Sequence, residues 1–361
     1  MKSPIILLGI IILSIILIYS CEKNSTGFSG IQIDDDPQII YIARKFINQG
    51  WGVAVSLNIM DGQGRNHKEL ISVSDGYVKE AYFSTDGEKI LFVMHSDSMG
   101  SGENLYVMNY DGSNLLQITV TDTTIAYFAP QFTPDESKVI YLAIVNHQGY
   151  QIRMFDMISK EHTILVHETY DGRRPIVSHD GSFLFYNNID YNVHRILLDG
   201  LSDEKLTNLG YTSQIQLSGD GRTVYFVSQI DHLQYDLFSM TLEGENIRRV
   251  TTLNNSSTAY FRISQDESKI LSLLSPSGTG QSVAIMNSNG SNLDTTYINK
   301  DCFHSFEFFP DNKNIIFEVY EGENPYSVSN IYRINVSGED LRKLSHDKYF
   351  ANKFECFRPR L

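Results

Sequence analysis

An acidic turn recurs along almost the whole chain at steps of 40 to 49 residues. In each copy an apolar residue, a small or polar residue and any third residue precede the acid, and a new apolar run follows. The acids of the six clear copies are Asp86, Asp135, Asp180, Asp220, Asp266 and Asp311, and a degenerate seventh copy ends at Arg360. This period is the length of one four-stranded propeller blade, so the sequence predicts about seven blades.

The segments between the turns favour strands. β-branched and aromatic runs follow the acidic turns, as in Lys89–Val93, Lys138–Leu142 and Thr223–Val227. A second hairpin signal, such as Leu105–Asn114, follows in most units. After residue 20 no segment shows a sustained helical period. We therefore expect an all-β fold: a seven-bladed β-propeller of four-stranded antiparallel blades, with almost no helix.

The repeat resembles that of the TolB-like (WD40-like) β-propellers, whose blades read roughly F-S-P-D-G and then I-Y-x-M-N-x-D-G-S-N-x-x-R-L-T. The end of the second motif is present at Glu204–Thr207, Ile247–Thr251 and Leu341–Ser345, and the resemblance covers nearly everything after residue 38. It implies the fold but not one function, because related blades occur in binding proteins, protease accessory domains and some lyases. The chain departs from that family in two ways: it has no room for the N-terminal α/β domain, and it carries an anchor signal where TolB is soluble and periplasmic.

The sequence also predicts how the ring closes. Gln38–Ala43 aligns with the second strand of a blade, so the first blade begins without its innermost strand. Lys353–Pro359 aligns with that missing strand. We expect the C-terminal strand to complete blade 1, which would leave no free sheet edge at the junction.

The N-terminus is typical of a bacterial lipoprotein. Lys2 precedes an apolar run from Ile5 to Tyr19, and Ser20 precedes Cys21, the residue that would take the lipid. The alternative is a plain membrane anchor, but the run is shorter than the roughly 20 residues that span a bilayer. The expected organisation is a signal peptide over residues 1–20, a flexible tether over 21–37 and the propeller domain over 38–361.

The chain is acidic, with a formal net charge of −14, and loss of Lys2 with the signal peptide would make it −15. Such a surface argues against binding nucleic acid, or an anionic membrane, through a basic face. After lipidation of Cys21 only Cys302 and Cys356 remain, both in predicted innermost strands of neighbouring blades. Either a disulfide or two buried thiols is compatible with these positions.

Catalytic and metal-binding motifs are absent from the sequence. It contains no Gly-x-Ser-x-Gly, no His-Glu-x-x-His and no phosphate-binding Gly-x-x-x-x-Gly-Lys. His162 and His167 are five residues apart, which places them on opposite faces of a strand. The repeated aspartates are better explained as residues of tight turns than as calcium ligands, because Asp in such a turn accepts hydrogen bonds from nearby N–H groups. We expect no cofactor, no metal and no catalytic residue.

Aromatic residues occur just before nearly every innermost strand. In a propeller these connecting loops surround one mouth of the central channel, a common place for a ligand. Core packing between blades is the alternative role for these rings. The candidate binding residues are Tyr77, Tyr127, Tyr170, Arg173, Arg174, Tyr211, Tyr260, Arg262, Phe303, His304 and Tyr349.

Two functions from different classes remain open. One is a non-catalytic, lipid-anchored envelope propeller, on the periplasmic or outer-membrane face, that binds a protein, peptide or glycan at the channel mouth. The other is a propeller lyase or hydrolase that acts on saccharides, with side chains from distant blades converging in the channel.

Overall fold

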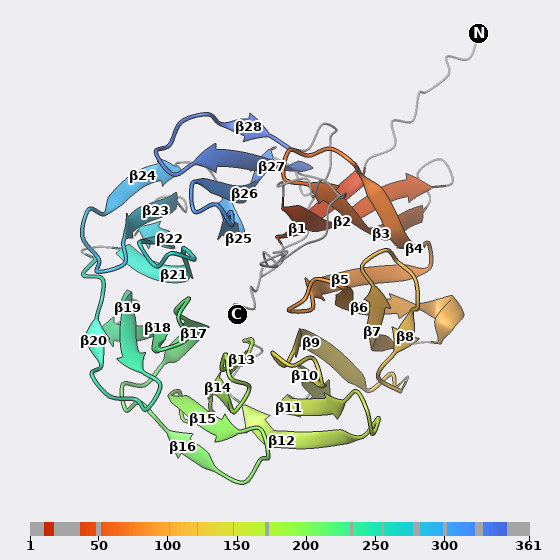
Figure 1. Ribbon diagram of the computed structural model, residues 1–361, viewed down its shortest axis with the longest axis horizontal. Helices are drawn as coiled ribbons and strands as arrows, with labels where there is room; N and C mark the ends of the chain where they lie inside the picture. Colours follow the sequence, from red (N-terminus) through yellow and green to blue (C-terminus); the bar gives the residue numbers. More distant parts are fainter. Residues whose placement is uncertain are drawn as a thin grey trace, which may run out of the picture.

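The computed structural model describes residues 11–17, 37–47, 52–100, 102–120, 122–146, 148–169, 173–231, 234–253, 256–276, 282–298, 302–321 and 328–344. Seven four-stranded antiparallel sheets stand around a central axis like the blades of a propeller (Figure 1). The predicted fold class is confirmed. Within the described ranges, helical structure is limited to the short 3-10 helix η2 (Asp97–Met99).

The first four blades follow one another in chain order, each with its strands in sequential order. Blade 1 contains β1 (Ile11–Leu17), β2 (Gln38–Ile47), β3 (Gly52–Asp61) and β4 (Lys68–Val73). Blade 2 contains β5 (Gly76–Phe83), β6 (Lys89–Ser96), β7 (Glu103–Asn109) and β8 (Leu116–Gln117). Blade 3 contains β9 (Ile125–Phe132), β10 (Lys138–Val145), β11 (Gln148–Asp156) and β12 (His162–Thr169). Blade 4 contains β13 (Ile176–Val177), β14 (Phe183–Asn187), β15 (Val193–Leu197) and β16 (Asp203–Lys205).

The remaining three blades continue the same pattern. Blade 5 contains β17 (Thr212–Leu217), β18 (Thr223–Asp231), β19 (Gln234–Thr241) and β20 (Arg248–Arg249). Blade 6 contains β21 (Ser256–Ile263), β22 (Lys269–Pro276), β23 (Ser282–Asn287) and β24 (Asp294–Ile298). Blade 7 contains β25 (Cys302–Phe308), β26 (Asn314–Glu321), β27 (Val328–Asn335) and β28 (Arg342–Lys343).

The hydrophobic core lies between neighbouring blades. Strand side chains point alternately to the two faces of a sheet, so each blade packs against both of its neighbours. Between blades 2 and 3, for example, Leu91 and Val93 pack with Tyr141, and all three are buried. Ile39 of blade 1 belongs to a buried cluster with Phe309 of blade 7, so the core continues across the junction where the ring closes.

The acidic turns form a local hydrogen-bond motif. Ser84 Oγ donates to Asp86 Oδ1 at 2.6 Å, and the same carboxylate oxygen accepts from the Glu88 N–H at 2.8 Å. The Lys89 N–H then donates to Ser84 Oγ at 3.0 Å. The hydroxyl-to-carboxylate bond recurs in Thr133/Asp135, Ser178/Asp180, Ser218/Asp220 and Ser264/Asp266. The motif agrees with the interpretation of these aspartates as turn residues.

This motif predicts a local pH dependence. Hydrogen bonds from Ser178 and from the Ser182 N–H favour the ionised Asp180 and hold the pKa of its carboxyl below the usual value. A lowered folded-state pKa contributes stability above the unfolded pKa of about 3.9, and that stability is lost as pH falls through the folded pKa. Ser178→Ala should therefore raise the pKa of Asp180, and Ser178→Thr, the arrangement found at Thr133, should not. Carboxyl ¹³C NMR titration measures both, and equal pKa values in the two variants would contradict the prediction.

A second repeated contact joins the third and fourth strands of several blades. In blade 4 the Thr207 hydroxyl donates to Asn192 Oδ1 at 3.2 Å and accepts from the Val193 N–H at 2.9 Å. The same contact is made by Asn104 with Thr119 in blade 2 and by Asp236 with Thr251 in blade 5. It gives a structural role to the threonine that ends the repeated motif.

Blade 1 differs from the prediction for its innermost strand. β1 takes this position and pairs antiparallel with β2, from Ile11 opposite Lys45 to Leu17 opposite Ile39. β1 comes from the apolar run that the sequence assigns to the signal peptide, and its isoleucine-rich sequence has a high strand preference. The expected closing segment, Lys353–Pro359, lies outside the described residues. β2 itself is the second strand of the blade, as predicted.

The described part of the apolar N-terminal run is β1, and Cys21 lies outside the described residues. Among the described residues, no helix is long and apolar enough to span a membrane.

Candidate functional site

The two faces of the propeller carry different connections. In each antiparallel blade, the turn between the second and third strands and the connection to the next blade leave the sheet on the same side. We call this side the connector face; the acidic turns lie on the opposite face. The connector face includes η2 in blade 2, the turn Asn188–Asn192 in blade 4 and the connection Leu209–Tyr211 between blades 4 and 5.

Tyr77 and Tyr127 belong to a polar network between blades 2 and 3. The Tyr77 hydroxyl donates to Glu103 Oε1 at 2.5 Å, and its ring stacks on His95 with centroids 5.3 Å apart. Glu103 also binds Lys79 Nζ at 2.7 Å and accepts from the Tyr127 N–H at 3.1 Å. Burial, followed by the bond to Glu103, raises the pKa of Tyr77, and burial raises the pKa of Tyr127. Glu103 therefore links Tyr77 of blade 2 to the backbone of Tyr127 in blade 3.

Arg174 lies near the axis and joins three blades. Its guanidinium stacks on the ring of Tyr82 in β5 at 4.1 Å, and Nη2 donates to the Pro130 carbonyl of β9 at 3.3 Å. The side chain of a blade 4 residue therefore reaches past blade 3 to blade 2. Its neighbour Arg173 is exposed.

Arg262 makes a corresponding contact between blades 6 and 7. Its Nε lies 3.2 Å from Glu307 Oε2, and each of these side chains is only 8% exposed. Tyr260 is half-buried in the core layer of the same two blades. Arg174 and Arg262 thus contact neighbouring blades, and Tyr260 packs between blades 6 and 7; a binding role for these residues stays a prediction.

The structure does not describe the side chains of four other candidates. Tyr170 and Tyr349 lie outside the described residues, as does the lipidation candidate Cys21. Phe303 and His304 are part of β25, but the positions of their side chains are not described.

Among the candidates with described side chains, Tyr211 is the exposed aromatic residue, with 52% of its surface exposed. Its ring lies against that of Tyr191, with centroids 4.7 Å apart and an interplanar angle of 34°. We call these two residues the tyrosine pair. Tyr191 was missed by the sequence analysis, which considered only residues just before innermost strands, whereas Tyr191 lies in the turn between β14 and β15. The motif Asp190-Tyr191-Asn192 in a tight turn was the available signal.

Both members of the tyrosine pair have left-handed backbone conformations, with φ of 62° at Tyr191 and 49° at Tyr211. Bulky residues rarely adopt these angles, which cost of the order of 1 kcal/mol or more per residue. Thr212 fixes the connection between them, because its N–H and hydroxyl both donate to the Tyr191 carbonyl, at 2.9 and 3.1 Å. The surrounding structure thus holds the pair in an unfavourable backbone geometry.

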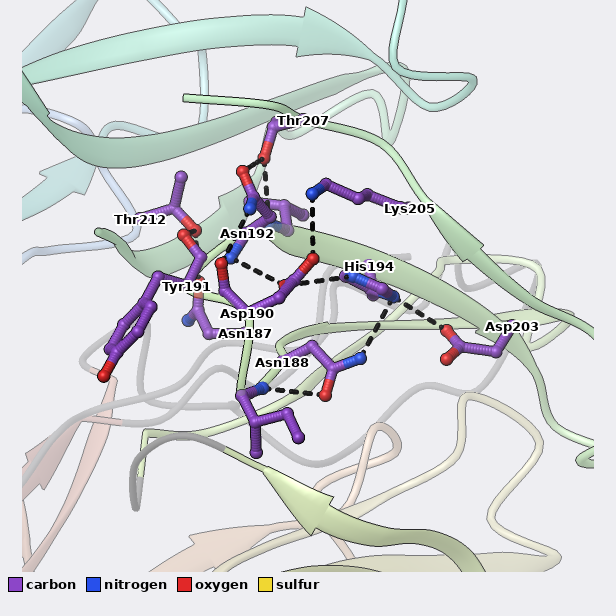
Figure 2. Close-up of polar contacts among 12 residues, drawn as sticks. Asn187, Asn188, Asp190, Tyr191, Asn192, His194, Asp203, Lys205, Thr207 and Thr212 are labelled. Atoms are coloured by element: carbon purple, nitrogen blue, oxygen red, sulfur yellow. Dashed lines mark hydrogen bonds and ion pairs between the residues drawn. The ribbon is translucent and has the colours of Figure 1, made fainter. Parts of the chain in front are cut away.

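Asn192 organises the backbone next to the pair, and Figure 2 shows it between Asp190 and Thr207. Its Oδ1 accepts from the N–H groups of Leu209 and Gly210, at 3.0 and 3.2 Å, and from the Thr207 hydroxyl. Its own N–H donates to Asp190 Oδ1 at 3.1 Å. One side chain therefore ties the turn of blade 4 to the connection that carries Tyr211.

A charged cluster lies next to Asn192 (Figure 2). Asp190 is 2.9 Å from Lys205 Nζ and 3.2 Å from His194 Nε2, and His194 Nδ1 is 3.2 Å from Asp203 Oδ1. Burial opposes the ionised form of Asp190, but hydrogen bonds from Lys205 and His194 outweigh it and lower the pKa of this carboxyl. The two carboxylates lie on opposite nitrogens of the imidazole and so do not converge on one point. In the described ranges, no group of three or more His, Cys, Asp or Glu side chains is arranged to hold a metal ion.

Comparison with solved structures identifies the fold. TolB from Acinetobacter baumannii superposes with a TM-score of 0.52 at 16% identity, over 82% of this chain and 78% of that protein. An oligogalacturonate lyase from Vibrio parahaemolyticus superposes with a TM-score of 0.59 at 14% identity, over 84% of each chain. The β-propeller domain of the Trilobed protease from Pyrococcus furiosus gives 0.61 at 12% identity, over 86% of this chain and 95% of that one.

Sequence comparison adds no closer assignment. No family model matches the chain, and no curated protein is significantly similar to it. At these identities the structural similarities establish architecture and leave the ligand open. The chain is a seven-bladed β-propeller, and its fold is similar to the folds of these three solved structures.

Proposed function

We propose that this chain is a non-catalytic, lipid-anchored propeller of a bacterial cell envelope, on its periplasmic or outer-membrane face, that binds a protein, peptide or glycan with the connector face. The tyrosine pair carries this proposal. Tyrosines that are exposed and held rigidly are frequent at binding sites, because they offer a large contact area and lose little conformational freedom on binding. The anchor is proposed from the signal at residues 1–21, with Cys21 as the lipidated residue.

Three polar side chains in or next to the innermost strands form contacts between blades, and these contacts favour binding over catalysis in the channel. Arg174 contacts Tyr82 and Pro130, Arg262 contacts Glu307, and Gln131 Nε2 donates to the Pro175 carbonyl at 2.5 Å. These groups bind one another across blade boundaries. A saccharide lyase or hydrolase in the channel, the alternative function, would need such groups to face a substrate.

Site-specific photo-crosslinking in cells tests the proposal. A benzophenone amino acid at position 211 should crosslink to a discrete partner that mass spectrometry or glycan analysis identifies. The same group at Ile158 is the matched control: this residue is 84% exposed and lies in a turn of the opposite face. Cys21→Ala should move the protein from the membrane fraction to the soluble fraction and weaken crosslinking if the partner is membrane-bound. Equal crosslinking from positions 158 and 211, or none from the connector face, would contradict the proposal.

A further inference from the structure

We infer that the tyrosine pair is the docking site for a protein segment that places an apolar or aromatic side chain on the rings, with a basic residue beside it. The inference rests on the proposed function and deepens it: it assigns the binding site to the junction of blades 4 and 5 and names the chemistry of the partner. Four observations support it, namely the strained backbone of the pair, its apolar neighbours, the internal pairing of the nearby polar groups and the local charge.

In the described part of the chain, Tyr191 and Tyr211 are the only aromatic residues with a positive φ, a conformation that smaller or more polar residues such as Ala129 and Glu80 share. Asn and Gly are the residues that accept positive φ at low cost, and the same chain uses them at most of its tight turns, such as Gly200 and Gly210. Tyrosine at positions 191 and 211 costs stability. Tyr211 also gains little from burial, since about half of its surface faces solvent. Strain of this kind is typical of functional sites, where the surrounding structure holds a side chain ready for its ligand.

Apolar side chains extend the surface next to the rings. Ile189 is 50% exposed in the turn that carries Tyr191, and Leu209 is 43% exposed in the connection that carries Tyr211. Exposed aliphatic and aromatic residues that gather at one place, with polar groups at their edge, mark protein-binding surfaces. Scattered single exposed residues, such as Leu201 on the opposite face, need no such explanation.

The polar groups behind the pair favour a protein segment over a glycan. A glycan needs several donors and acceptors directed outward, but Asn192 is engaged by Leu209, Gly210 and Thr207, and Asp190 is engaged by Lys205 and His194. Ile189, Leu209 and the tyrosine pair therefore form the apolar part of this surface, beside the partly exposed charged side chains of Asp190 and Lys205. Burial of such a surface drives protein association.

The charge near the pair favours a basic partner. Asp190 and Asp203 share Lys205 and His194 in blade 4, and the exposed Asp231 adds a carboxylate at the end of β18 in blade 5. The whole chain carries a formal charge of −14. A lysine or arginine beside the apolar anchor would be attracted by these carboxylates, and complementary charge speeds association and selects among partners.

Fluorescence anisotropy with defined synthetic peptides tests the inference on the mature chain. A labelled peptide with a Lys-Leu-Phe-Lys core should bind. Peptides with Glu-Leu-Phe-Glu or Lys-Ser-Ser-Lys cores should bind at least about ten-fold more weakly, since the first is repelled and the second lacks an anchor. Raised salt should weaken the Lys-Leu-Phe-Lys complex. Equal binding of all three peptides, or preference for a neutral oligosaccharide probe, would overturn the inference.

Tyr211→Asn separates a binding role from a structural one. Asparagine accepts positive φ, so the thermal midpoint of unfolding should stay the same or rise, while affinity for the Lys-Leu-Phe-Lys peptide should fall by about ten-fold or more. Tyr211→Phe should keep the affinity, and Ile158→Ser on the opposite face should change neither property. Unchanged affinity in Tyr211→Asn would overturn the inference. If position 211 crosslinks in cells to a glycan or to an acidic segment, the inference fails but the proposed function stands.

Discussion

Replacing Arg249 with methionine is expected to lower the free energy of unfolding by about 3 to 5 kcal/mol, because it leaves the buried carboxylate of Asp236 without its ion-pair partner. The Asp236 side chain has no exposed surface. Arg249 Nε donates to Asp236 Oδ2 at 2.6 Å, and the Arg249 Nη2 is in direct contact with the same oxygen. The other carboxylate oxygen accepts from the Thr251 hydroxyl at 2.8 Å. Denaturant unfolding measures the loss.

The other blades show which second substitution should restore the stability that Arg249→Met removes. Blades 2 and 4 have the neutral Asn104 and Asn192 where blade 5 has Asp236, and each asparagine accepts from its threonine in the same way. The double variant Asp236→Asn, Arg249→Met should therefore recover most of the lost stability, to within about 1 kcal/mol of the wild type. Arg248→Met is the matched control, because Arg248 is exposed and donates to Ser239 Oγ; it should cost under about 1 kcal/mol. A double variant no more stable than Arg249→Met would show that the ion pair is not the cause.

The period of the acidic turns was enough to predict the propeller because it is set by local chemistry. Five of the six clear copies have a hydroxyl residue, an aspartate and an apolar run in fixed order, and the bond from Ser84 to Asp86 shows why; the sixth has Phe309 in place of the hydroxyl residue. The blade interiors follow from alternation of apolar residues, as in Leu91 and Val93, which pack against blade 3. These features depend on residues that are close in sequence or that lie in the adjacent blade, so the sequence pattern is enough to predict them.

The candidate site was only partly accessible to the same reasoning. Position in a connecting loop predicts the face on which Tyr77 and Tyr211 lie, but it does not predict that Glu103 engages the first while the second is exposed. The partner of Tyr211 comes from a different turn, 20 residues earlier, and is brought near by Asn192 and Thr212. Contacts between separate turns depend on how blades 4 and 5 pack, which no local motif encodes.

Deleting residues 352–361 is expected to destabilise the mature chain far more than the full-length chain. Removal of residues 1–20 takes away β1 and would leave the edge of β2 free, and the C-terminal strand is predicted to fill that position. An open edge weakens the packing of Ile39 and Tyr41 against blade 7 and invites aggregation. Loss of about 3 to 5 kcal/mol would lower the thermal midpoint of the mature chain by roughly 10 °C, at about 2–4 °C for each kcal/mol. The same deletion in a chain that keeps β1 should lower the midpoint by much less, because β1 pairs with β2 in its place.

Four proteins, with and without residues 1–20 and with and without residues 352–361, complete the experiment. Calorimetry gives the midpoints, and light scattering at low concentration reports association through the free edge. If the deletion is equally harmful with and without β1, the C-terminal segment supports the ring at another place. If it is harmless in the mature chain, blade 1 functions with three strands and the packing of blades 7 and 1 alone closes the ring. The predicted difference arises because both segments compete for one strand position, and signal-peptide removal decides which of them can occupy it.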